Sequence, residues 1–221
     1  MDTFSLKKDG RATAALWQSN APVRNVYTYE LKGYRNRTSG GVMYADRGAS
    51  PSRLTYNTIW HQLELTNNSK VPWTTGAALT MQGPLPLGQD ILAYTSIGGK
   101  TLLPLTIAVD VRGATEEEEV SRQPNAANFE SYSYALVKKK GTISVTNSRK
   151  ENSDMCVSLA IGGKVESATD AGKVKLNDFR NDDWDDAGYM RVNNHSDVTW
   201  EFTLKPGETK MVSYTVSFYV R

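Results

Sequence analysis

The chain of 221 residues has little of the chemistry that most metal and thiol sites need, with one cysteine and two histidines. A single cysteine, Cys156, excludes an internal disulfide and a cysteine-rich zinc cluster. His61 and His195 are too few for a metal site with three histidine ligands. Cys156 lies between Met155 and Val157 in a predicted strand, so we interpret it as a small buried hydrophobe rather than a catalytic thiol.

An excess of charge and long apolar runs are also missing. Lys and Arg number 26 against 24 Asp and Glu, for a net charge of +2, so no global field attracts nucleic acid or an acidic membrane. No window approaches 18 consecutive apolar residues, and the first eight residues lack the apolar region of a secretory signal, so we expect no direct membrane insertion. The strand-like residues 4–6 directly after Met1 are consistent with a piece of a longer protein.

Motifs of the common enzyme classes are absent from the sequence. It contains no glycine-rich phosphate loop, no G-x-G-x-x-G, no G-x-S-x-G elbow and no H-E-x-x-H. We therefore expect a non-enzymatic protein without a cofactor. Paired carboxylates for glycoside hydrolysis stay open, because their separation is a property of the fold.

What the sequence does contain is alternation of apolar and polar residues with a period of two, which is typical of strands that bury one face. Turn sequences such as Gly98-Gly99, Gly162-Gly163 and residues 205–208 separate these stretches. The pattern predicts an all-β fold with little helix. The alternating sets are Ile59, His61, Leu63 and Leu65; Ala77, Leu79 and Met81; Leu103, Leu105, Ile107, Val109 and Val111; Met155, Val157, Leu159 and Ile161; Val198, Trp200, Phe202 and Leu204; and Val212, Tyr214, Val216, Phe218 and Val220.

A polar segment without apolar rhythm, residues 116–128, suggests a domain boundary. We expect two consecutive Ig-like β-sandwich modules, residues 1–128 and 129–221. The like-charged runs at 116–119 and 138–140 are interpreted as solvated turns or strand ends.

The loop around Trp184 is the most acidic part of the chain and can supply oxygen ligands to Ca²⁺. The alternative is a solvated loop whose Trp184 is pinned to the module. Exposed tryptophans stack on sugar rings, and Trp184 and Trp73 are the candidates for binding a glycan, whereas Trp200 falls on a predicted core face. The candidate calcium ligands are Asp182, Asp183, Asp185 and Asp186.

Residues 65–79, LTNNSKVPWTTGAAL, combine the end of a strand, an N-x-S turn and a P-x-T-x-G segment. This stretch resembles the uncharacterised C-terminal β domain of bacterial mucoidy-inhibitor-like proteins. Residues 88–90, 141–147 and 200–214 are compatible with the same family. The resemblance implies no catalytic residues, and it implies an exported protein, so a periplasmic, cell-surface or extracellular location is favoured.

Together these features predict a non-enzymatic structural or protein-interaction β module of a bacterial envelope or extracellular protein. Its expected partner is another protein or a second copy of the chain, with no role for nucleic acid. The alternatives are a carbohydrate-binding module and, further, a hydrolase based on carboxylates.

Overall fold

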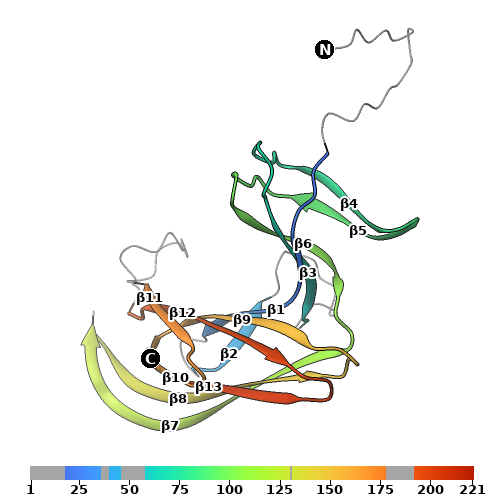
Figure 1. The fold of residues 1–221 in the computed structure, drawn as a ribbon. Helices are drawn as coiled ribbons and strands as arrows, with labels where there is room; N and C mark the ends of the chain where they lie inside the picture. The colour runs from blue at the N-terminus through green and yellow to red at the C-terminus, as the bar shows by residue number, and fades with distance from the viewer. Residues whose placement is uncertain (1–17, 36–39, 46–57, 130, 178–191) are drawn as a thin grey trace, which may run out of the picture.

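The computed structural model describes residues 18–35, 40–45, 58–129, 131–177 and 192–221, and it is an all-β, sandwich-like fold (Figure 1). In this described part there is no helix with the length and hydrophobicity needed to cross a membrane. The strands are β1 (Val23–Arg35), β2 (Val42–Ala45), β3 (Trp60–Thr66), β4 (Gly76–Gln82), β5 (Leu85–Leu92), β6 (Lys100–Ile107), β7 (Val111–Phe129), β8 (Tyr132–Asn147), β9 (Ser153–Gly162), β10 (Lys164–Ala168), β11 (Lys173–Asn177), β12 (His195–Leu204) and β13 (Thr209–Val220).

Two sheets pack face to face around one core. The large sheet has the order β11-β12-β9-β1-β3-β6, with β2 paired to β1, and the small sheet has the order β10-β13-β8-β7. Side chains from both sheets fill the space between them, because each central strand buries alternate residues. The largest fully buried side chains include Trp200 and Tyr29 from the large sheet and Tyr214, Phe218 and Ile143 from the small sheet.

The predicted alternation is confirmed in the strands that form the centre of the sandwich. Alternate residues from Met155 to Ile161 in β9 and from Val212 to Val220 in β13 are buried. Other predicted faces are not buried. Val109 is 74% exposed beyond the end of β6, and the most buried side chain of β3 is Gln62, not an apolar residue. Gln62 lies on the other face from His61, and its Nε2 donates a 2.6 Å hydrogen bond to Thr28 Oγ1.

The expected division near residue 128 differs from the observed strand pairing. Strand β1 pairs in parallel with β9, and β7 pairs with β8 along a long antiparallel hairpin that contains residue 128. The core therefore contains side chains that precede residue 128 in the sequence and side chains that follow it. The segment 116–128 lacks apolar rhythm because it belongs to an edge strand, not because it links two modules.

The two like-charged runs face each other across this hairpin. In the register of β7 and β8, Glu118 lies opposite Lys140 and Glu119 opposite Lys139. The Lys139 ammonium also lies 3.8 Å from a carboxylate oxygen of Glu117, whose other oxygen accepts a 2.9 Å hydrogen bond from the Tyr214 hydroxyl. The runs are thus a cross-strand match of opposite charges inside a sheet, rather than turns.

Two fully buried asparagines, each at the end of a strand, make the same set of hydrogen bonds to neighbouring loops. Asn67 follows β3, and Asn147 ends β8. The backbone of Asn67 bonds to Gly98 and Gly99, just before the paired strand β6. The backbone of Asn147 bonds likewise to Gly207 and Glu208, just before the paired strand β13. Each asparagine side chain then donates to backbone carbonyls of the adjoining loops at 2.9 to 3.2 Å.

Strands β4 and β5 form a third, two-stranded sheet, called the ribbon below. Figure 1 shows the ribbon beside β6 with its tip pointing away from the sandwich. Gly88 allows this close contact, since a Cβ atom there would lie 2.8 Å from the Leu105 carbonyl oxygen in β6. A larger residue at position 88 would push the ribbon off β6.

Candidate functional site

The acidic loop predicted to hold calcium, with Asp182, Asp183, Asp185, Asp186 and Trp184, lies outside the described residues. In the part of the chain that the structure covers, no group of three or more His, Cys, Asp and Glu side chains converges in a way that could hold a metal ion.

The other residue proposed to bind a glycan, Trp73, is placed in the interior. It forms an isolated bridge with Thr95 and is 5% exposed. Its indole therefore offers no open face to a sugar ring. Trp200 is buried as expected, and its Nε1 donates a 2.9 Å hydrogen bond to the Thr169 carbonyl.

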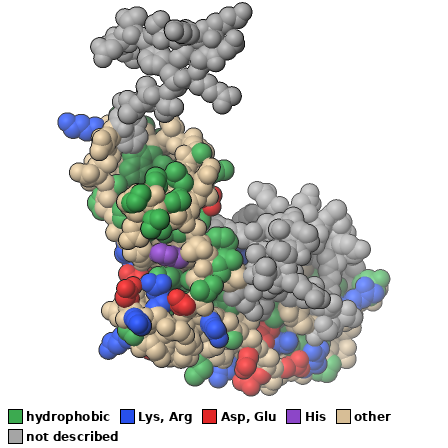
Figure 2. Space-filling model, turned by 90° about the vertical axis from the view of Figure 1, so that its right-hand side faces the viewer, with side chains coloured by type: hydrophobic (Ala, Val, Ile, Leu, Met, Phe, Trp, Pro, Cys, Tyr) green, Lys and Arg blue, Asp and Glu red, His purple; other side chains and the backbone are tan. Residues whose placement is uncertain are grey.

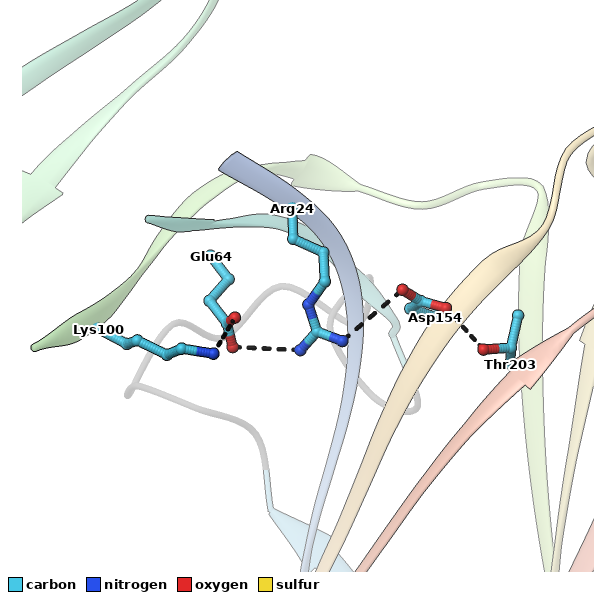
Figure 3. Close-up of polar contacts among 5 residues, drawn as sticks. All are labelled: Arg24, Glu64, Lys100, Asp154 and Thr203. Carbon is cyan, nitrogen blue, oxygen red and sulfur yellow. Dashed lines mark hydrogen bonds and ion pairs between the residues drawn. The ribbon is translucent and has the colours of Figure 1, made fainter. Parts of the chain in front are cut away.

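A groove lined by both charged and apolar side chains crosses the outer face of the large sheet, the face turned away from the small sheet. Its volume is about 290 Å³. Arg24 on β1 lies at its centre, with one guanidinium nitrogen 3.2 Å from Glu64 on β3 and another 3.7 Å from Asp154 on β9 (Figure 3). Lys100 on β6 extends the row, 2.9 Å from Glu64, and Thr203 on β12 donates a 2.7 Å hydrogen bond to Asp154. The row alternates in charge across neighbouring strands.

Opposite charges in this row neutralise one another, and this bears on whether Glu64 can act as a general acid. The hydrogen bond from Lys100, followed by that from Arg24, holds the pKa of Glu64 below its ordinary value despite some burial. A general acid in glycoside hydrolysis needs a raised pKa, so Glu64 is not suited to that role. The geometry fits a stabilising ladder of cross-strand ion pairs.

The two groups that could form a thiol–histidine pair lie on opposite faces of the large sheet. Cys156 lines the groove, and burial raises the pKa of its thiol. His61 is stacked on Tyr27 with a centroid distance of 4.9 Å, and its Nε2 lies 2.8 Å from Asn25 Oδ1. Asn25 and Tyr27 alternate along β1 with the groove residues Arg24 and Val26, so the sheet separates the thiol from the imidazole.

The second histidine is also remote from Cys156. His195 starts β12 opposite Gly162, whereas Cys156 lies opposite Glu201 in the same register. Six residues along a strand span about 20 Å. His195 instead pairs with Asp197 at 3.4 Å.

The ribbon carries a surface of a different kind, made of exposed apolar side chains. In the antiparallel register Ala77 faces Ile91 and Leu79 faces Gln89, and a bulge after Thr80 brings Met81 next to Pro86 and Leu87. One face of the ribbon thus presents Ala77, Leu79, Met81, Leu87 and Ile91, which we call the apolar stripe, and Pro86 and Gln89 lie on the same face. The opposite face, with Ala78, Thr80, Gly88 and Leu92, is half-buried and turned toward β6.

The large side chains of the apolar stripe are open to solvent, with exposures of 59% for Leu79, 51% for Met81, 45% for Leu87 and 63% for Ile91. Figure 2 looks at the ribbon from the side of its tip and shows hydrophobic side chains gathered over this upper part of the molecule. The alternation of Ala77, Leu79 and Met81 predicted a buried face, and the structure corrects this prediction. Among the described residues the ribbon has two strands, and β6 packs against its other face.

A signal for the apolar stripe was present in the sequence. Residues 76–92 contain only one charged side chain, Asp90, although strands with a solvated face normally carry several. Comparisons with protein-family models, with curated proteins and with solved structures find no match to this chain.

Proposed function

We propose that the chain is a non-enzymatic protein-interaction module that docks through the apolar stripe of the ribbon. The observation that supports this proposal is the exposure of Leu79, Met81, Leu87 and Ile91 together on one face. Contiguous apolar patches on soluble proteins mark interaction sites, whereas single exposed apolar residues are ordinary.

The stability of the ribbon supports the same proposal. A two-stranded ribbon is marginally stable in water, and it gains stability when a hydrophobic face is covered. In the described part of the chain, β6 partly covers the face with Thr80 and Gly88, and the side chains of the apolar stripe are exposed. A partner that covers the apolar stripe would remove the remaining apolar surface from water and order the ribbon.

The wider role that we propose is that of an Ig-like structural module of a bacterial envelope or extracellular protein. It rests on the resemblance of residues 65–79 to the C-terminal β domain of mucoidy-inhibitor-like proteins. In the fold, this stretch runs from the end of β3 through the buried Asn67 and Trp73 into β4. The resembling residues therefore lead from β3 into the ribbon and include the first part of β4.

The proposal is tested with a hydrophobic dye and two matched double variants. L79K/I91K places two charges on the apolar stripe, whereas V109K/M211K places two charges at other exposed apolar residues, which are 74% and 66% exposed. Dye fluorescence per chain is measured over a dilution series, because self-association at high protein concentration would hide the stripe from the dye and dilution would expose it. At low protein concentration we expect the dye fluorescence of L79K/I91K to be roughly half that of wild type or less, and that of V109K/M211K to equal wild type. Equal signals from the two variants would remove the proposal.

A further inference from the structure

We infer that the apolar stripe is covered by the apolar stripe of a second copy of this chain, related by a two-fold axis near Leu79. The inference rests on the proposed function and names its partner. It follows from the order of side chains along the ribbon, from the charge of this face and from the exposed area.

The order of residues makes the stripe self-complementary. Ile91 lies toward one end of the ribbon, Leu79 lies in the middle, and Met81 with Leu87 lies toward the tip. A two-fold axis through the middle stacks two ribbons in opposite directions. Leu79 then meets its own copy, and Ile91 meets Met81 and Leu87 of the second chain, as a symmetric interface requires.

The charge of the ribbon allows this contact. Asp90, the one charged residue in 76–92, lies opposite Ala78 on the face turned toward β6, and its Oδ1 accepts a 2.7 Å hydrogen bond from the Ile91 backbone. Two stripes therefore approach without like charges between them. The absence of Lys and Arg from residues 76–92 disfavours an anionic lipid surface or a nucleic acid as the partner.

The exposed area of the stripe is about half of what a standard dimer interface buries on each partner. Taking about 180 Å² for a fully exposed Leu, Ile or Met, the four large residues of the stripe present on the order of 400 Å². A standard interface buries about 800 Å² per partner, of which roughly 65% is apolar in homodimers. The stripe thus supplies most of the apolar centre, with the exposed Gln89 beside Leu79, and exposed polar residues around the ribbon such as Thr74 would form the rim.

Sedimentation equilibrium of the full chain, with L79K and L79E variants, tests the inference. We expect wild type to reach twice the chain mass of 24.5 kDa as concentration rises. Each variant alone places two like charges on the axis, and we expect its dimer dissociation constant to rise roughly 100-fold or more. Mixing L79K with L79E brings opposite charges together on the axis, and we expect the mixed dimer to form again. V109K is the control and should dimerise like wild type.

Three outcomes would overturn the inference. One is a wild-type chain that stays monomeric up to about 100 μM, a concentration well above the dissociation constant of an ordinary dimer. Another is a failure of the L79K and L79E mixture to associate when each variant is folded. The third is a monomer that binds vesicles of neutral phosphatidylcholine in a manner that depends on Leu79. A monomeric wild type whose dye signal is still lost in L79K/I91K would leave the proposed function standing, whereas equal dye signals would remove both.

Discussion

At the scale of single residues, the side chain of Asn147 joins two turns of the fold by hydrogen bonds. It is fully buried, and its amide donates to the carbonyls of Glu151, Leu204 and Lys205. Removing the amide would leave these carbonyls without their donor in the interior, which is costly because burial deprives them of water. The asparagine thereby ties the β8–β9 turn to the β12–β13 turn.

We expect Asn147→Ala to lower the free energy of unfolding by about 2–4 kcal/mol, the range for loss of a buried hydrogen-bond network. Urea unfolding followed by far-UV circular dichroism measures the loss. Asn68→Ala, at an exposed neighbour of the other buried asparagine, is the control and should change stability little. A loss in Asn147→Ala no larger than in the control would contradict the role assigned to the side chain.

His61 gives the fold a dependence on pH. Burial, followed by the positive charge of Arg149, lowers the pKa of His61 from its ordinary value of 6.5. The folded state therefore binds this proton less readily than the unfolded state does. Its contribution to stability is fully present above pH about 6.5 and is lost as pH falls from there through the lowered pKa of the folded state.

We expect the free energy of unfolding to decrease as pH falls through this window, and His61→Gln to flatten the decrease. Chemical unfolding at a series of pH values measures it. Glu64 contributes in the same direction at lower pH, because its pKa is lowered by Lys100 and Arg24 and its protonation breaks both contacts. If the free energy of unfolding of His61→Gln decreased as much as that of wild type at pH values above the titration of Glu64, His61 would not be the group responsible.

At the scale of elements, the row of charges joins four strands of the large sheet. Lys100, Glu64, Arg24 and Asp154 come from β6, β3, β1 and β9 in that order. The side chain of Arg24 is 55% exposed, so solvent and salt screen its pairs. The row aligns neighbouring strands rather than supplying a large stabilisation.

We expect Arg24→Gln to cost at most about 1 kcal/mol, as is typical of exposed ion pairs, and the cost to shrink at high salt. Thermal unfolding in low and high salt measures both. Lys32→Gln, on the same strand and exposed, is the control. A loss of several kcal/mol that salt leaves unchanged would show that Arg24 has another role.

For the whole molecule, the parallel pairing of β1 with β9 joins strands from both ends of the chain in one sheet. Residues from β1, including Tyr29 and Leu31, share the core with β9, β12 and β13. A chain cut at residue 128 would separate these strands and split the β7–β8 hairpin near its end.

We expect the full chain to unfold in a single transition of the sandwich and a fragment of residues 129–221 to be unfolded, because it lacks β1 and β7. Calorimetry and the dispersion of amide signals in NMR spectra measure the two properties. A fragment of 129–221 with the dispersed spectrum of a folded domain would instead support two independent modules.

The all-β class and the buried faces of the central strands β9, β12 and β13 follow from the amino-acid sequence without the structure. These faces are properties of single strands, because alternation is local and a strand covered on one side must bury every second residue. For the same reason Trp200 was placed correctly in the core.

The pairing of the strands and the exposure of particular apolar faces become visible in the three-dimensional fold. Strand β1, with Arg24 and Tyr29, pairs with β9 more than a hundred residues away, and no local pattern encodes that contact. Leu79 and Met81 alternate as core residues do, yet they are exposed, because burial depends on a second layer and not on the strand. The candidate interface therefore lies where the alternation predicts a core and where the described strands supply no second layer to cover it.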